Sequence, residues 1–175
     1  MTDSLTFSPI DLDEHAEVCV AFRLDSYVCS FGTTTHFYVD NTNEEGYVDW
    51  LRARMRESPG SCVHLWRGAR IIGQLEMGGS QAGAEIGHVN LYYLVPEARG
   101  SGAGERLDEY VSGFYANLGL HEARLNVSPS NERAIRHYLK HGWKNLGPDP
   151  RYPEVLQFEK LFSSPAEPAG GSGRR

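Results

Sequence analysis

Residues 91–107, LYYLVPEARGSGAGERL, constrain this chain most, because an apolar run and a proline lead through a glycine-dense turn into a helical pattern. Gly100, Gly102 and Gly104 lack a Cβ atom, so the backbone there can adopt positive φ and approach a bulky ligand closely. The helix that follows offers unpaired N–H groups and the positive end of its dipole. The pattern therefore predicts a strand, a tight turn and a helix that together bind an anion such as a diphosphate.

The spacing of these glycines excludes two common phosphate-binding loops. A dinucleotide fingerprint GxGxxG needs a glycine where the chain has Glu105 or Leu107. A nucleoside-triphosphate loop needs Gly-Lys-Ser/Thr, which does not follow the glycines. The pattern that remains is Arg99-x-x-Gly102-x-Gly104, placed directly after an apolar strand.

This pattern resembles the coenzyme A motif [Gln/Arg]-x-x-Gly-x-[Gly/Ala] of the GNAT superfamily of N-acetyltransferases. A second element of that family, Asn-x-x-Ala followed by Tyr and by Gly-aromatic, is matched in order by Asn131, Ala134, Tyr138, Gly142 and Trp143. The resemblance covers residues 60–162 best. It implies a mixed α/β fold with a mostly antiparallel central sheet and helices on both faces. It also implies acetyl-CoA as co-substrate and a primary amine of a small molecule or protein as acceptor.

The resemblance assigns coenzyme A contacts to the end of the strand, the glycine turn and the start of a later helix. The residues concerned are Leu94, Val95, Arg99, Gly100, Ser101, Gly102, Ala103, Gly104, Glu105 and Asn131. Leu94 and Val95 would offer backbone groups to the pantetheine arm and to the oxyanion. The Arg99 side chain either reaches a phosphate or lies in solvent, and Asn131 either contacts the pantetheine arm or caps a helix.

Tyr138 is the candidate general acid. Transfer to an amine expels the coenzyme A thiolate, and a phenol with a pKa near 10 is a suitable proton donor to sulfur. Asn131, Ala134 and Tyr138 recur at helical spacings, so we expect them on one helix face. From the residues alone, a core aromatic is the competing interpretation, and the family resemblance favours the acid.

His88 is the first candidate for the general base, because some family members carry a catalytic Glu at this place and His titrates near pH 6.5. Strand alternation predicts that it shares one face with Asn90, Tyr92 and Leu94. Glu76 on the preceding strand is the competing base, or an anchor for a substrate ammonium. A partly buried histidine and a solvent-facing glutamate are the structural alternatives.

The acceptor site is expected to involve Phe31, His36 and Tyr92. Segment 29–43 is aromatic and shows no helical period, so we expect a loop there. The turn at residues 152–154 is a further candidate. A polyamine, an amino sugar and a protein amine all remain open as acceptors, and so does a homodimer.

Length and composition predict one domain, 1–162, followed by a disordered Ser/Pro/Gly/Ala-rich tail, 163–175. The formal charge of −6 argues against nucleic acid or an anionic membrane as partner. Three cysteines without CxxC spacing, and no apolar leader or span, favour the cytoplasm. His137 and His141 lie four residues apart without a third ligand nearby, so we expect no metal.

The expected elements alternate between strands and helices. Strands are predicted at 6–9, 62–66, 71–77, 86–95, 123–127 and 153–162, and helices at 11–27, 43–56 and 102–118 and from 130 or 131 onward. No cysteine lies in either motif, which favours direct attack in a ternary complex over an acetyl-enzyme. The alternatives are a non-catalytic acyl-CoA sensor and a transferase for longer acyl chains.

Overall fold

A single mixed sheet organises the chain in a computed structural model, which describes residues 4–79 and 85–162. Seven strands follow the order β1-β2-β3-β4-β5-β7-β6. They are β1 (Leu5–Pro9), β2 (Cys62–Arg67), β3 (Arg70–Gly78), β4 (Ile86–Leu94), β5 (Glu122–Val127), β6 (Lys144–Pro148) and β7 (Leu156–Leu161). Neighbouring strands are antiparallel except β4 and β5, which are parallel. The predicted fold class is confirmed.

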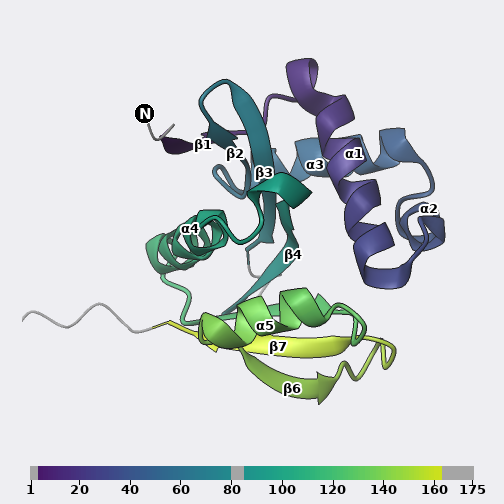
Figure 1. The fold of residues 1–175 in the computed structure, drawn as a ribbon, viewed down its shortest axis with the longest axis vertical. Helices are drawn as coiled ribbons and strands as arrows, with labels where there is room; N and C mark the ends of the chain where they lie inside the picture. The colour runs from purple at the N-terminus through teal and green to yellow at the C-terminus, as the bar shows by residue number, and fades with distance from the viewer. Residues whose placement is uncertain (1–3, 80–84, 163–175) are drawn as a thin grey trace, which may run out of the picture.

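Helices cover both faces of this sheet (Figure 1). They are α1 (Leu12–Phe31), α2 (Thr35–Asn41), α3 (Glu44–Glu57), α4 (Ala103–Asn117) and α5 (Glu132–Lys140), with a 3₁₀ turn at Pro96–Ala98. Figure 1 shows α1, α2 and α3 on one side of β2–β4, α4 on the other side, and α5 beside β7. On α4, Leu107, Val111 and Tyr115 recur every four residues and are buried against the sheet. Burial of each such side chain contributes about 1.5–3 kcal/mol.

The sheet divides between β4 and β5. Their pairing runs only from Ile86↔Glu122 to Val89↔Leu125, and beyond it β4 continues with β3 while β5 continues with β7. On the other edge of β4, Glu76 pairs with Leu91 but Met77 pairs with Val89, so Asn90 is the extra residue of a β-bulge. The bulge and the division occur at the same level of β4.

The bulge corrects one prediction, that His88, Asn90, Tyr92 and Leu94 share a face. An extra residue interrupts the two-residue alternation of a strand. Two residues an even number of positions apart, one on each side of the bulge, therefore no longer point to the same face of the sheet. The charge of Arg54 on α3 acts on the imidazole of His88, whereas the Tyr92 hydroxyl donates to Asp108 on α4. The two side chains therefore lie on opposite faces of the sheet.

The segment expected to be a loop, 29–43, is mostly helical. It contains the last turn of α1, which ends at Gly32 with φ 71°, and the whole of α2. Phe37 of α2 is fully buried and packs against Tyr27 and Tyr47, with ring centroids 5.9 and 5.7 Å apart. Tertiary burial therefore overrides the low helix propensity of this segment.

The C-terminal part differs from the prediction by one strand. β6 pairs with β7 at the sheet edge but contains Gly147 and Pro148, residues that weaken a strand signal. The last strand begins at Leu156 instead of residue 153. The tail predicted at 163–175 lies outside the described residues. Among the helices of the described residues, none has the length and apolarity needed to cross a membrane.

Candidate active site

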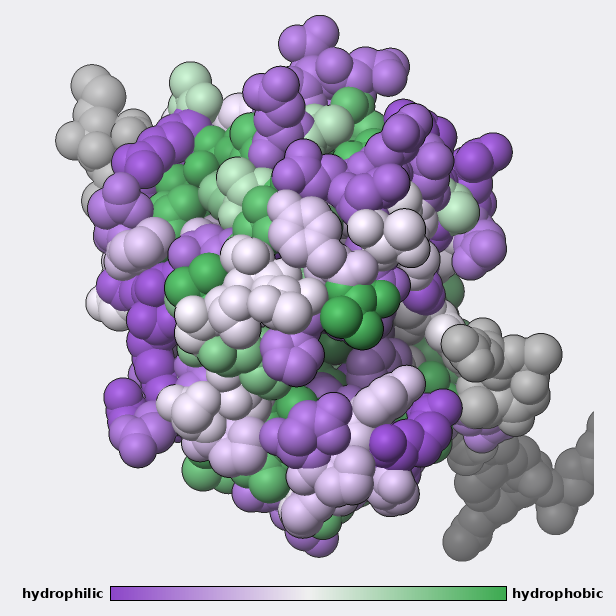
Figure 2. Space-filling model, turned by 90° about the vertical axis from the view of Figure 1, so that its right-hand side faces the viewer, coloured by the Kyte–Doolittle hydropathy of each residue, from purple (hydrophilic) through white to green (hydrophobic). Residues whose placement is uncertain are grey.

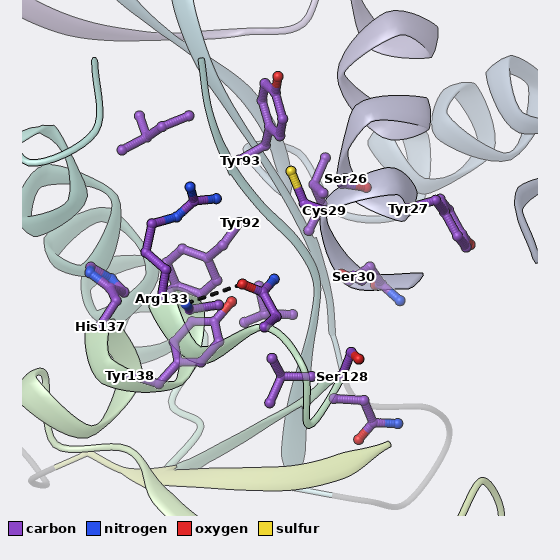
Figure 3. A pocket seen from close by; sticks show the side chains of 18 of the residues that line it. Ser26, Tyr27, Cys29, Ser30, Tyr92, Tyr93, Ser128, Arg133, His137 and Tyr138 are labelled. Atoms are coloured by element: carbon purple, nitrogen blue, oxygen red, sulfur yellow. Dashed lines mark hydrogen bonds between the residues drawn. The ribbon is translucent and has the colours of Figure 1, made fainter. Parts of the chain in front are cut away.

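A cavity of about 670 Å³ lies where β4 and β5 separate. Its volume is in the range of small-molecule and cofactor sites. Figure 2 shows a recess in the side of the molecule that carries α1 and α2, with hydrophilic and hydrophobic residues around it. In Figure 3, Arg133, His137 and Tyr138 of α5 lie on one side of the cavity, and Ser26, Cys29 and Ser30 of α1 lie across from them.

The cavity brings together most of the residues that the sequence predicted. Those that line it are Phe31, His36, His88, Tyr92, Leu94, Arg99, Gly100, Gly104, Glu105, Asn131 and Tyr138. Those outside the lining are Glu76, Val95, Ser101, Gly102 and Ala103. Two segments far apart in the sequence, α1 and α5, therefore contribute to the same site as the glycine turn.

The glycine turn forms a cradle at the start of α4. Gly100 and Gly102 have φ of 70° and 84°, a left-handed conformation that favours glycine. Gly102 provides no side-chain cap to α4, which leaves N–H groups of the first turn for a ligand. A Cβ atom on Gly104 would lie 2.9 Å from the ring of His137, so any other residue here would have to displace that ring. The cradle suits a diphosphate.

Basic side chains surround this cradle. Arg133, His137, Lys140 and His141 of α5 and the adjacent turn line the cavity beside Gly104. Lys140 Nζ lies 3.2 Å from Glu105 Oε1. The Glu105 backbone N–H and then Lys140 lower the pKa of Glu105, so this carboxylate stays ionised with its charge compensated. The excess positive charge at this end favours an anionic ligand group.

The Arg99 side chain lines the cavity and is mostly buried, so it does not lie free in solvent. Its Nε donates to the Leu94 carbonyl oxygen at 3.0 Å, and its Nη2 lies 3.7 Å from Asp25 Oδ2. The guanidinium therefore ties the end of β4 to α1. Arg133 and Lys140 are further cations of the cavity lining, and the sequence motif gave no sign of them.

Tyr138 lies in the cavity wall with only 8% of its surface exposed. Its ring packs against Tyr92 and Trp143, with centroids 5.5 and 6.0 Å apart, and Figure 3 shows its hydroxyl turned toward the cavity. Burial raises the pKa of Tyr138, so the phenol stays protonated at neutral pH. Asn131 Oδ1 accepts from the Ala134 N–H at 3.3 Å, so it caps α5 while also lining the cavity.

Tyr92 contributes its ring to the cavity, while its hydroxyl is used elsewhere. The hydroxyl donates to Asp108 Oδ1 at 3.4 Å. Asp108 also accepts from Trp143 Nε1 at 3.2 Å and from Lys160 Nζ at 2.6 Å. This network connects β4, α4 and β7 behind Tyr138 and fixes the wall on which the candidate acid rests.

The two candidate bases occupy different environments. His88 lines the cavity, and burial followed by the nearby Arg54 guanidinium lowers the pKa of His88, which leaves its imidazole neutral. Glu76 is fully buried, pairs with Arg23 Nη1 at 3.1 Å and accepts from Gln74 and Tyr47. Glu76 is outside the cavity lining, and its ion-pair partner Arg23 is part of that lining.

The mouth opposite the cradle is aromatic and acidic. Phe31 and His36 have ring centroids 4.6 Å apart, and Tyr27 donates to Asp40 Oδ2 at 2.6 Å. Asp40 and Glu154 are also part of the cavity lining. No cluster of three or more His, Cys, Asp or Glu suited to a metal occurs among residues 4–79 and 85–162.

Comparison with known proteins gives one family and many similar folds. The model of the acetyltransferase (GNAT) family matches residues 24–143. The PaiA N-acetyltransferase of Thermoplasma acidophilum, solved with coenzyme A, is 17% identical with a TM-score of 0.74, covering 91% of this chain and 99% of that one. A search of curated proteins gives no significant match.

Two further structures have the same fold. Spermidine N-acetyltransferase of Vibrio cholerae, solved with coenzyme A and spermine, is 15% identical with a TM-score of 0.69, covering 90% of this chain and 95% of that one. An N-acetyltransferase of Staphylococcus aureus is 13% identical with a TM-score of 0.68, covering 91% and 99%. At these identities the likeness concerns the fold.

Proposed function

Because the chain belongs to the acetyltransferase (GNAT) family, we propose that it transfers an acetyl group from acetyl-CoA to a primary amine by direct attack in a ternary complex. The observation that carries this proposal is the cavity at the division of β4 and β5, which has the glycine cradle at one end and Tyr138 in its wall. Acetyl-CoA supplies the activated thioester. The chain supplies binding, orientation and proton transfer.

Cofactor binding follows from the cradle. The first N–H groups of α4 face the diphosphate, and Arg133 and Lys140 add positive charge beside it. The end of β4 at Leu94 offers backbone groups to the pantetheine arm, because β4 has no partner strand on that edge beyond Val89. The thioester then lies near the division of the strands, close to Tyr138.

Three proton transfers complete the reaction. His88 accepts a proton from the substrate ammonium, directly or through water, and its neutral state suits that role. The amine nitrogen bonds to the carbonyl carbon, the carbon–sulfur bond breaks, and Tyr138 gives its proton to the thiolate. The second proton that the nitrogen loses as the amide forms passes, directly or through water, to the Tyr138 oxygen and restores the phenol. Burial raises the pKa of Tyr138, which keeps the phenol protonated until the thiolate leaves.

The charges along the cavity favour a cationic acceptor. Basic residues line the cavity beside the cradle, whereas Asp40 lies with Tyr27, and Glu154 and Phe31 also belong to the lining. Aromatic faces and carboxylates together attract ammonium groups. The complex of the Vibrio cholerae relative with spermine supports an acceptor with more than one ammonium.

Calorimetry with acetyl-CoA and thiol release across an amine panel test the proposal together. The panel contains diamines, polyamines, amino sugars, amino acids and peptides. We expect binding of acetyl-CoA and release of thiol that depends on the amine, fastest with diamines or polyamines. Binding without thiol release by any amine would contradict a transferase and favour an acyl-CoA sensor.

A further inference from the structure

The candidate acid and the bound thioester belong to different parts of the sheet. Tyr138 lies on α5, which runs beside β7 (Figure 1), and its ring packs against Phe158 of β7 with centroids 5.9 Å apart. This acid part consists of β5–β7 and α5. In the proposed reaction, acetyl-CoA binds along β4, in the cofactor part, β1–β4. The pairing of β4 with β5 ends at Val89↔Leu125, so other contacts must fix the acid relative to the thioester.

One carboxylate contacts both parts. Asp108 of α4 is buried, and its Oδ1 atom accepts from the Tyr92 hydroxyl at 3.4 Å and from Trp143 Nε1 at 3.2 Å. Its Oδ2 atom accepts from Lys160 Nζ at 2.6 Å. Tyr92 is on β4 in the cofactor part, whereas Trp143 follows α5 and Lys160 is on β7 in the acid part. Asp108 therefore bridges the division of the sheet on the side of α4.

The two rings that Asp108 holds are also neighbours of the Tyr138 ring. Tyr138 packs against Tyr92 and Trp143 with centroids 5.5 and 6.0 Å apart, and the rings of Tyr92 and Trp143 are 6.3 Å from each other. Interiors are close-packed, so a shift of either ring displaces the ring that touches it. The Asp108 carboxylate therefore acts on the position of Tyr138 without contacting it.

Lys160 fixes the orientation of this carboxylate. The side chains of Asp108 and Lys160 are 11% and 15% exposed, so bulk water solvates neither charge well. A buried carboxylate is tolerated when an opposite charge and hydrogen bonds compensate it. The charge-assisted bond from Lys160 occupies Oδ2 and leaves Oδ1 for the two aromatic donors.

We propose that Asp108, fixed by Lys160, is a positioning residue that holds the Tyr138 hydroxyl at the thioester by joining the two parts of the sheet. This inference rests on the proposed acetyl transfer. Neither Asp108 nor Lys160 lines the cavity, so both act through the rings between them and the site. Misplacement of a reacting group by about 1 Å can slow a reaction up to roughly a hundredfold.

The test is a double-mutant cycle between Asp108 and Tyr138. Asp108→Asn keeps the size of the side chain and one acceptor oxygen but removes the charge that pairs with Lys160. It should lower kcat by roughly tenfold or more in the wild-type background. In the Tyr138→Phe background, where no phenol is left to position, the same change should lower kcat by less than about twofold.

Variants of Lys160 test the bridge from its other end. Lys160→Met removes the donor to Oδ2 and should lower kcat about as much as Asp108→Asn. Lys160→Arg keeps a cation that donates to a carboxylate and should retain most of the rate. The Lys160→Met variant can replace Asp108→Asn in the cycle if the latter does not fold.

Controls separate positioning from stability and from cofactor binding. Tyr115, on the same helix and outside the cavity lining, donates to the Gly78 carbonyl at 3.0 Å, a contact that stays within the cofactor part. Tyr115→Phe should lower the midpoint of chemical denaturation and leave kcat unchanged. Acetyl-CoA affinity, measured by calorimetry, should stay within about threefold in every variant.

Three results would overturn the inference. Unchanged kcat in Asp108→Asn would show that the bridge does not affect the reaction. An equal fall in kcat with and without the Tyr138 hydroxyl would show a general structural role. A fall in acetyl-CoA affinity as large as the fall in kcat/KM would show that Asp108 shapes the cofactor site. Failure of the wild-type protein to acetylate any amine would instead refute the proposed function.

Discussion

Tyr138 of α5 packs edge-on against Tyr92 of β4, with ring centroids 5.5 Å apart, and the Tyr92 hydroxyl is anchored on Asp108. The candidate acid therefore rests on a wall whose own polar groups are satisfied. Its hydroxyl is left to face the cavity, where the leaving sulfur is expected. This arrangement allows the proton donor to be tested apart from the packing of its ring.

Tyr138→Phe should lower kcat by roughly a hundredfold, because it removes the proton donor and keeps the ring. Acetyl-CoA affinity, measured by calorimetry, should change little. Tyr110→Phe is the matched control, since its hydroxyl donates to the Gly60 carbonyl outside the cavity lining. A fall in cofactor affinity with unchanged kcat would rule out the acid role.

The pH dependence of kcat/KM should identify His88. Only its neutral form accepts a proton, and burial with Arg54 lowers the pKa of His88, so the acidic limb should lie below pH 6.5. His88→Ala should slow the reaction and remove that limb, while His15→Ala, outside the lining, should keep it. An acidic limb that persists in His88→Ala would assign the base elsewhere.

Gly104→Ala should weaken acetyl-CoA binding by about tenfold, because the added Cβ would lie 2.9 Å from His137 and displace its ring into the cradle. Gly113→Ala is made in the same helix, where a Cβ has nothing within 4 Å. That control should bind normally and gain about 1 kcal/mol of stability from helix propensity. Equal affinities for both variants would show that the cradle does not hold the cofactor.

Stability should fall on acidification because of His64. Its Nε2 lies 2.9 Å from Gln74 Oε1, and burial lowers the pKa of His64 from 6.5 to about 4. Between these values the unfolded chain binds more protons than the native one, so the free energy of unfolding declines as pH drops through this window. The decline attributable to His64 is on the order of 3 kcal/mol.

Chemical denaturation at pH 7 and pH 4 measures this decline. His64→Gln keeps a polar partner for Gln74 and has no titrating group, so its decline should be smaller than that of the wild-type protein. Identical declines in the two proteins would exclude His64 as the source.

The sequence predicted the glycine cradle and the α5 face well, because both depend on local spacing. Gly102 must adopt positive φ, and Asn131, Ala134 and Tyr138 recur at helical intervals, so neither needs knowledge of distant contacts. The helix α2 was missed because Phe37 is helical through burial against residues of α1 and α3. Such tertiary support leaves no periodic signal in a short segment.

The opposite wall of the site could not be predicted from periodicity. The bulge at Asn90 reverses the strand alternation, and it is supported by Arg23 and Glu76, which lie far from it in the sequence. In the sequence, a charged Glu76 on a strand indicates a solvent-facing or catalytic residue. The structure shows instead that Glu76 is buried in an ion pair with Arg23. Long-range pairings of this kind shape the cavity wall next to α1.

Transfer of an isotopically labelled acetyl group from acetyl-CoA to a diamine, followed by mass spectrometry, tests the central claim most directly. We predict labelled amide in amounts equal to the thiol released, with both lost together in Tyr138→Phe. Thiol release without labelled amide would show hydrolysis of the thioester instead of transfer, and would contradict the account of this cavity as an amine acetyltransferase site.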